Sequence, residues 1–395
     1  MKDENYGVLF PEGFQAGFAA CGIKSADLDV ALLIADDPCV AAGVFTRNSF
    51  AAAPVQWNRR ILPSEKLKAV VVNSGNANAC TGVKGMRDVE TSAQLVADLI
   101  GCGPEQVAVA STGIIGHPLP MEKLTSGIRA AFDALGAAEE SAQGAARAIM
   151  TTDTYPKWTT GGGRVGKSDF KVGGMAKGSG MISPDMATML GFVTTDLKAS
   201  EDVLSDTLRR VADRTFNRIT VDGDSSTNDT VLLLASGTSG ADSSGAEPGE
   251  IESAFEAVMG RLAREIVRDG EGATRLIEVE VIGAKDEQDA ERAARAIANS
   301  PLVKCAMNGG DPNWGRIVCA AGYSGAEINP ETTRLSLGDA VVFKAGLPTG
   351  VEAAEEVSGD EIAIRLELGM GTGGATVWTC DLSKEYVEIN AEYHT

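Results

Sequence analysis

The chain has 395 residues, 44% of them hydrophobic, and carries a formal net charge of −20 at pH 7. This length allows two or three domains with buried cores, and the hydrophobic content excludes a disordered protein. The negative charge argues against nucleic-acid and anionic-membrane partners, and no apolar run reaches the roughly 18 residues that a membrane-spanning helix needs.

The amino-terminal segment, MKDENYGVLFPEGFQAG, has neither the basic-plus-apolar pattern of a signal peptide nor the arginine-rich pattern of a transit peptide. Seven cysteines are scattered along the chain without a C-x-x-C pair. This spacing favours reduced thiols that are buried as small apolar residues over a disulfide framework or a zinc site. We therefore expect a cytoplasmic protein.

Short apolar runs that end in glycine, serine or asparagine are interspersed with helical patterns. The runs predict buried strands that open into loops, at residues 29–36, 68–76, 106–113, 230–237 and 276–283. Helical patterns occupy residues 89–101, 137–150, 200–217, 250–267 and 289–300. Ser200, which two acidic residues follow, is a typical helix start. The mixed order of elements predicts an α+β or layered α/β class.

Two polar stretches divide these elements. Residues 236–250, SGTSGADSSGAEPGE, are almost free of apolar side chains and predict a surface loop. The turn-like RDGEGAT (268–274) precedes a new strand–helix pattern. We therefore expect a main domain over residues 1–275 and a smaller domain over residues 276–395.

Residues 161–168, GGGRVGKS, match the phosphate-binding pattern G-x-x-x-x-G-K-[ST]. That loop needs a buried strand before it and a helix after it, because the free N–H groups of the helix contact the phosphates. Here the preceding TYPKWTT is not an apolar strand, and the following SDFKVGGMAKGSG alternates in polarity and contains glycines. The pattern therefore favours a hairpin with a glycine-rich turn over nucleotide binding.

Histidine is scarce, since His117 and His394 are the only two in the chain. A metal site with several histidines is therefore not expected, and a Ser-His-Asp or Cys-His mechanism would have one plausible base. A hydroxyl nucleophile in this chain would instead depend on a lysine, a carboxylate or an α-amine.

The run AKGSGMISPDMATML (176–190) places Thr188 between the small Ala187 and an apolar stretch. If the bond between Ala187 and Thr188 were cut, the freed α-amine, which titrates at about pH 8, could act as base for the Thr188 hydroxyl. The cut itself would be an attack of that hydroxyl on the Ala187 carbonyl, followed by hydrolysis of the ester. From the residues alone, a threonine that opens a buried strand is the alternative interpretation.

The segment KGSGMISPDMATML (177–190) resembles the self-cleavage segment of the ornithine acetyltransferase (glutamate N-acetyltransferase) family, enzymes of arginine biosynthesis. Further segments resemble the family in the same order, so that the resemblance covers essentially the whole chain. They are GVFTRNSFAAAPV (43–55), VVNSGNANACTG (71–82), ASTGIIGHPLP (110–120), TTDTYPK (151–157), DGDSSTNDT (222–230), RDGEGAT (268–274), SPLVKCAMNGGDPNWGR (300–316) and INAEYHT (389–395).

The resemblance implies roles for particular residues. Thr188 would be the nucleophile that cleavage after Ala187 frees, and Thr112 with Gly113 would form the oxyanion hole. The resemblance gives His117 no role, and we expect it in a loop. The implied substrate contacts are Thr154, Lys177, Thr188, Glu271, Asn390 and Thr395.

The chemistry of the substrates fits these contacts. N-acetylornithine and glutamate both carry an α-carboxylate, which suits Lys177 or hydroxyl donors, and the side-chain ammonium of ornithine suits Glu271. The implied reaction is a double displacement in which Thr188 takes acetyl from N-acetylornithine and passes it to glutamate. No metal or cofactor is implied. Acetyl-CoA is a second acetyl donor only in the bifunctional members of the family, and we favour the bifunctional type.

The resemblance also implies a fold and an assembly. The fold would be an αββα sandwich of the N-terminal-nucleophile type with a smaller C-terminal α/β domain, whose tail returns to the site. Cleavage would give an α chain of residues 1–187 and a β chain of residues 188–395, which stay together and pair into an α2β2 heterotetramer.

Two alternatives of a different kind stay open at this point. The first is an N-terminal-nucleophile amidohydrolase or aminopeptidase, in which water takes the acyl group, and only dependence on an acceptor separates it from the transferase. The second is a small-molecule binding protein without enzymatic activity, which predicts an intact chain.

Overall fold

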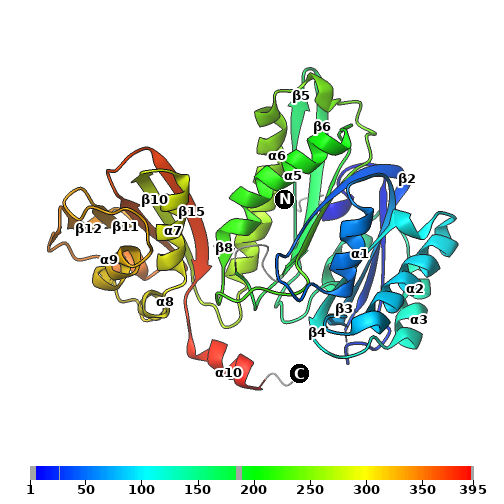
Figure 1. The fold of residues 1–395 in the computed structure, drawn as a ribbon, viewed down its shortest axis with the longest axis horizontal. Coiled ribbons are helices and arrows are strands. Elements are labelled where there is room, and N and C mark those ends of the chain that lie inside the picture. The colour runs from blue at the N-terminus through cyan, green and yellow to red at the C-terminus, as the bar shows by residue number, and fades with distance from the viewer. Residues whose placement is uncertain (1–5, 26, 184–188, 393–395) are drawn as a thin grey trace.

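The computed structural model describes residues 6–25, 27–183 and 189–392. Within these residues the strands form two sheets, and Figure 1 shows the first sheet with its helices on the right and the second on the left. The strand order of the first sheet is β4-β3-β2-β9-β7-β6-β5, and β1 pairs with β2 off this path. The order of the second is β13-β12-β11-β14-β10-β15-β8.

The bounds of the elements are as follows. The strands are β1 Phe14–Ala19, β2 Val30–Phe45, β3 Ser64–Asn76, β4 Val107–Ile114, β5 Lys157–Val165, β6 Ser168–Lys177, β7 Leu190–Thr195, β8 Ile219–Thr220, β9 Thr230–Ala235, β10 Leu276–Ala284, β11 Arg334–Leu337, β12 Ala340–Lys344, β13 Leu347–Pro348, β14 Glu361–Glu367 and β15 Gly373–Cys380. The α-helices are α1 Ala53–Ile61, α2 Gly82–Ile100, α3 Met121–Asp133, α4 Glu139–Ala148, α5 Glu201–Arg214, α6 Pro248–Arg268, α7 Glu287–Ala298, α8 Pro301–Asn308, α9 Trp314–Gly322 and α10 Lys384–Glu392.

The long strand β2 folds the first sheet into two layers. Its first half pairs with β1 and β3, its second half pairs with β9, and its register against β3 shifts between Ile34 and Cys39. One buried core contains Val70 and Val72 of β3 together with Phe192 of β7 and Leu232 of β9. Because strands far apart in the sheet share this core, the two halves pack face to face.

Helices cover the outer faces of both layers. Helices α1 and α2 pack on β3 and β4, and α3 packs on β1 and β2, through a core that includes Val71 and Val109. Helices α5 and α6 pack on the other layer through a core that includes Phe170 and Val193. The layers therefore run helix, sheet, sheet, helix, and the prediction of a layered α/β sandwich is confirmed.

The second sheet is covered by helices on one face. Strand β14 alternates between buried and exposed residues, as expected for a sheet with one covered face. Its buried side shares a core with α7, α8 and α9. The sheet begins with β10 at Leu276, where we placed the smaller domain, but β8 from the first part of the chain pairs with β15. We propose that the two domains divide between residues 275 and 276, although β8 of the main domain adds a strand to the sheet of the smaller domain.

The predicted strands and helices are all present, with shifted ends. Helix α2 begins at Gly82, seven residues before its predicted start. Ser200 precedes α5, and its hydroxyl accepts a hydrogen bond from the Val203 N–H, as predicted for a helix start. The sequence patterns missed β1, most of the second sheet and the helices α1, α3, α8, α9 and α10.

The segment GGGRVGKS lies in an antiparallel hairpin. Its residues close the turn between β5 and β6, where Gly166 adopts a φ of +59° that favours glycine. A strand follows the turn, so the segment lacks the helix N-terminus that a phosphate-binding loop uses. The hairpin prediction is confirmed.

The cysteine prediction is partly wrong. All seven cysteines are free, and Cys39 and Cys380 are buried. Cys80, Cys305 and Cys319 are exposed, because they lie in a loop and on the outward faces of α8 and α9.

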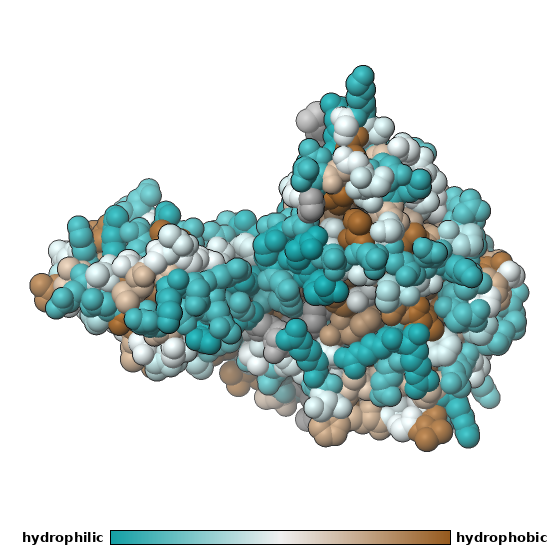
Figure 2. Space-filling model, turned by 45° about the horizontal axis from the view of Figure 1, so that its top comes forward, coloured by the Kyte–Doolittle hydropathy of each residue, from teal (hydrophilic) through white to brown (hydrophobic). Residues whose placement is uncertain are grey.

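The surface agrees with the charge of the chain. Figure 2 shows hydrophilic residues over most of the face in view, with hydrophobic residues in separate small patches. None of the helices in the described residues is long and apolar enough to cross a membrane. His117 is exposed in the loop between β4 and α3, as predicted.

We predict that Gly17→Ala destabilises the protein, because α3 lies directly against β1 there. A Cβ atom at position 17 would be 1.9 Å from the carbonyl oxygen of Ala131, so the helix has to move away. The expected loss is about 1–3 kcal/mol of unfolding free energy, measured by urea denaturation. Gly322→Ala, at the end of α9 with no atom within 4 Å of its added Cβ, is the matched control and should be neutral or slightly stabilising. Equal changes in the two variants would contradict this packing argument.

Candidate active site

A pocket of about 200 Å³ lies where the two layers of the first sheet meet. It is formed by the ends of β3, β4 and β6, by the segment before β9, by the loop after α6 and by α10. The lining residues are Ala77, Thr112, Gly113, Ile114, Ile115, Thr151, Thr152, Lys177, Gly180, Met181, Ser226, Asn228, Glu271 and Asn390. Such a concave site with a few converging polar groups is typical of a small-molecule pocket.

The end of β4 has a backbone that requires glycine. Gly113 has a φ of +131°, and a Cβ atom there would lie 2.3 Å from the carbonyl carbon of Gly75 on β3. The side-chain amide of Asn228 donates to the carbonyls of Ala77 and Ser111, at 2.6 and 2.8 Å. This buried asparagine therefore fixes the segment before β9 to the ends of β3 and β4.

Lys177, the last residue of β6, places a buried ammonium at the wall of the pocket. Its Nζ lies 2.7 Å from Thr151 Oγ1, 3.4 Å from Thr112 Oγ1 and 3.8 Å from Asp153 Oδ2. Burial lowers the pKa of this ammonium, and the carboxylate of Asp153 opposes that shift.

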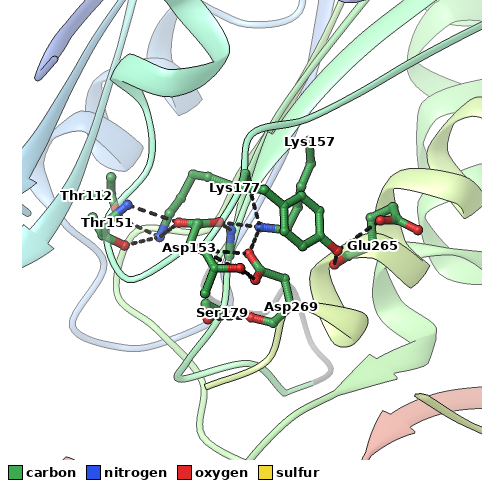
Figure 3. A network of polar contacts seen from close by, with 11 residues as sticks. Thr112, Thr151, Asp153, Lys157, Lys177, Ser179, Glu265 and Asp269 are labelled. Atoms are coloured by element: carbon green, nitrogen blue, oxygen red, sulfur yellow. Dashed lines mark hydrogen bonds and ion pairs between the residues drawn. The ribbon is translucent and has the colours of Figure 1, made fainter. Parts of the chain in front are cut away.

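A buried network of charges supports Lys177 (Figure 3). Lys157 Nζ binds Asp153 Oδ1 at 2.7 Å and Asp269 Oδ2 at 2.5 Å, and its side chain is fully buried. Asp153 also accepts hydrogen bonds from the N–H groups of Thr151 and Gly178. Burial acts to raise the pKa of the Asp153 carboxyl, but Lys177 and Lys157 outweigh it, so the pKa lies below its ordinary value.

Thr154 belongs to this network and is not among the residues that line the pocket. Its N–H donates to Asp269 Oδ2 at 3.0 Å, and its hydroxyl donates to the same carboxylate. Asp269 precedes the loop that carries Glu271 into the pocket. The structure thus places Thr154 behind the pocket wall.

Helix α10 lies against the pocket through Asn390. Asn390 Nδ2 donates to Glu271 Oε2 at 2.9 Å, and both residues line the pocket. Ser383 donates to the Gly272 carbonyl at 2.6 Å, and the Tyr386 hydroxyl lies 3.4 Å from Asp222 Oδ2. These contacts tie the helix down over the loop that follows α6.

Ala187, Thr188 and Thr395 lie outside the described residues. The first described residue after Thr188 is Met189, whose N–H donates to Asp229 Oδ1 at 3.1 Å. Burial raises the pKa of the Asp229 carboxyl well above its ordinary value. Its Oδ2 is buried and has no hydrogen-bond partner within the part of the chain that the structure describes.

Five of the predicted site residues therefore line one pocket, namely Thr112, Gly113, Lys177, Glu271 and Asn390. The sequence reasoning missed Thr151, Asn228 and the charged partners Asp153, Lys157 and Asp269. A signal for the charged partners was present, since they lie inside TTDTYPK and RDGEGAT, two segments that resemble the ornithine acetyltransferase family.

The chain is similar to known proteins of one family. A family profile described as the ArgJ family matches residues 15–395. The "Arginine biosynthesis bifunctional protein ArgJ" of Symbiobacterium thermophilum is 49% identical over 98% of each chain. A crystal structure of the protein with the same description from Bacillus halodurans is 44% identical, covers 51% of this chain and 98% of its own, and has a TM-score of 0.50. An ornithine acetyltransferase of Mycobacterium tuberculosis, solved in complex with ornithine, is 41% identical over 45% of this chain and 94% of its own, with a TM-score of 0.40.

We predict opposite effects when the two buried carboxyl groups are replaced by amides. At pH 7, Asp153→Asn should lower the unfolding free energy by about 3–5 kcal/mol, because it leaves Lys157 and Lys177 with one counter-ion fewer. Asp229→Asn should keep or raise the stability, because a group with a raised pKa costs free energy when it is charged. Urea denaturation of both variants measures these changes.

The two effects should also depend on pH in opposite ways. The lowered pKa of Asp153 stabilises the fold above the unfolded value of about 3.9 and loses this effect as the pH falls. The raised pKa of Asp229 favours the fold below about 3.9 and loses this effect as the pH rises. The deficit of Asp153→Asn should therefore shrink below about pH 4, and the advantage of Asp229→Asn should grow from about pH 4 upward. A similar, pH-independent loss in both variants would contradict the assignment.

Proposed function

The chain belongs to the ArgJ family, and on this basis we propose that it transfers acetyl from N-acetylornithine to glutamate through an acetyl ester of Thr188. Acetyl transfer in arginine biosynthesis is the activity of the family. The observation that supports the assignment most directly is the convergence of Thr112, Gly113, Lys177 and Glu271 in one pocket. Thr188 is bonded to Met189, whose N–H is fixed by Asp229 at the start of β7.

The proposal includes a self-cleavage step. Thr188 Oγ attacks the Ala187 carbonyl carbon, the peptide C–N bond breaks, and the nitrogen takes the proton to become an α-amine. Water then hydrolyses the ester and frees the hydroxyl. The solved chain from Bacillus halodurans supports this step, because it is matched almost completely by only half of this chain. A cut before Thr188 divides the chain near its middle.

Two half-reactions then share one set of donors. The α-amine of Thr188 takes the hydroxyl proton as Oγ attacks the acetyl carbonyl, and passes it to the nitrogen of ornithine as the amide bond breaks. The neutral amine of glutamate attacks the resulting ester, and Thr188 Oγ leaves with its proton restored. The Thr112 hydroxyl and the Gly113 N–H donate to the oxyanion in each step, where one such donor is worth roughly 3–4 kcal/mol.

The charges around the pocket suit these substrates. Glu271 supplies a carboxylate for the side-chain ammonium of ornithine, and the hydroxyls of Thr151 and Thr152 can donate to an α-carboxylate. We further propose that acetyl-CoA serves as a second acetyl donor, in line with the word "bifunctional" in the name of the relative. An α2β2 assembly of the cleaved chains, located in the cytoplasm, completes the proposal.

We predict that the purified protein consists of two chains that divide between Ala187 and Thr188. Intact mass spectrometry of the denatured protein should show two species whose masses add up to the full chain plus one water. Thr188→Ala should give one uncut species without transferase activity, because it has no hydroxyl to attack the carbonyl. Ser183→Ala, which removes a nearby hydroxyl, is the control and should still be cut. An uncut wild-type protein with full activity would rule out the cleavage mechanism.

The same purified protein can be assayed to determine whether glutamate or water accepts the acetyl group. Ornithine should be released from N-acetylornithine in step with the formation of N-acetylglutamate, with the parallel-line kinetics of a double displacement. Release at an equal rate without glutamate would assign the protein to the amidohydrolases. Binding without turnover by an uncut, folded protein would support the non-enzymatic alternative.

We predict that Glu271→Gln discriminates between the two substrates. The variant loses a charge that should pair with the ammonium of N-acetylornithine, so KM for this substrate should rise about 10- to 100-fold. KM for glutamate, whose side chain is anionic, should stay the same or fall. The amide can still accept a hydrogen bond from Asn390, which keeps α10 in place. An equal increase of both KM values would contradict the assignment.

A further inference from the structure

Lys177 has more partners than a lysine that only binds substrate would need. Its Nζ contacts Thr151 Oγ1, Thr112 Oγ1 and the carboxylate of Asp153 (Figure 3). An ammonium has three hydrogens and no lone pair, so it can only donate. It donates to the hydroxyls of Thr151 and Thr112 at 2.7 and 3.4 Å, whereas the Asp153 carboxylate at 3.8 Å forms an ion pair with it. Two of its hydrogens are therefore directed to threonine hydroxyls at the pocket wall.

The contact with Thr112 determines what the Thr112 hydroxyl can do. A hydroxyl has one hydrogen to donate and two lone pairs that accept. Because Lys177 occupies one lone pair as a donor, the hydrogen of Thr112 has to point elsewhere. Among the described residues, the Thr112 hydroxyl donates to no acceptor, and Thr112 lines the pocket. The hydrogen is thus available to an atom inside the pocket.

The charge of Lys177 is essential for this arrangement. A neutral amine has a lone pair and could accept the hydrogen of Thr112, which would then be lost to the pocket. The charged groups around Lys177 are Asp153, Glu271 and Asp229, which favour the ammonium, and Lys157, which disfavours it. Asp153 acts most strongly among them and opposes the effect of burial on the pKa of Lys177.

We propose that Lys177 is a positioning residue of the oxyanion hole: its ammonium, held by Asp153, donates to Thr112 and thereby directs the Thr112 hydrogen at the acyl oxygen. Thr112 is the catalytic residue, and Lys177 acts through it. The inference deepens the proposed acetyl transfer and rests on it. It also differs from the substrate contact that the family resemblance implies for Lys177, since that contact would act independently of Thr112.

A double-mutant cycle separates the two roles. Lys177→Met, Thr112→Val and the double variant are assayed with N-acetylornithine and glutamate, with rates expressed per mole of cleaved enzyme from intact mass. Each single variant should lower kcat about 100- to 1,000-fold, as expected for the loss of one oxyanion donor, with little change in KM. The double variant should be within about threefold of Thr112→Val, because residues that act as a unit are not additive. Losses that multiply, or a rise in KM for Lys177→Met alone, would overturn the proposal.

Thr112→Ser is the conservative control in this series. It keeps the hydroxyl and should recover most of the activity that Thr112→Val loses. A Thr112→Ser variant as slow as Thr112→Val would mean that the methyl group matters and not the hydrogen, and would overturn the proposal.

A second measurement keeps the test valid if a variant in the cycle is not cleaved. Asp153→Asn retains both Lys177 and Thr112 but removes the charge that favours the ammonium. Its kcat should fall with rising pH at a midpoint below that of the wild type, while KM stays constant. A uniform loss at every pH would show a structural role only, and an unchanged profile would show that Asp153 does not hold the charge; either result overturns the proposal. An inactive, fully cleaved wild-type protein would instead overturn the proposed function itself.

Discussion

Two buried lysines that share the buried Asp153 hold together the chain segments around the pocket. Lys157 binds Asp153 and Asp269, and Asp153 also faces Lys177. Removing such groups from water costs several kcal/mol for each ion, so each charge needs its partners in place. The network therefore fixes the loop after α4, the end of β6 and the loop after α6 relative to one another. Because these segments form part of the pocket wall, the network also fixes the shape of the pocket.

The same network connects the polar residues of the pocket to the two layers of the first sheet. Asp153 accepts hydrogen bonds from the backbone N–H groups of Thr151, in the loop after α4, and of Gly178, directly after β6. On the opposite layer, Asn228 fixes the ends of β3 and β4. Thr112 and Lys177, which come from different layers, are thus held at a defined separation. The charged residues that support Lys177 lie behind the pocket wall and do not line the pocket. A site on the rigid ends of strands needs this kind of support from behind.

The sequence predicted the parts of the molecule that depend on local patterns. Apolar runs predicted central strands such as β3, β4 and β9 because both faces of these strands are largely buried. The lack of a helix after Gly166 excluded a phosphate loop. The second sheet was mostly missed, since strands such as β11 and β12 span only four and five residues. Thr112 and Gly113 were found through family-like segments at a strand end. The pairing of Lys157 with Asp269, which lies 112 residues away, produces no local sequence pattern, so it could be recognised only from the three-dimensional fold.

The order of strands also bears on what a cut before Thr188 would do. Strands β7 and β9 would belong to the second fragment, yet they lie between β2 and β6 of the first. Strand β7 pairs with β6 over six residues, and β9 pairs with β2 over another six. Separating the fragments would break both ladders and expose the core between the layers and the cores under α5 and α6. Because each fragment completes the sheet of the other, one broken peptide bond before Thr188 would leave both ladders and the cores between them intact.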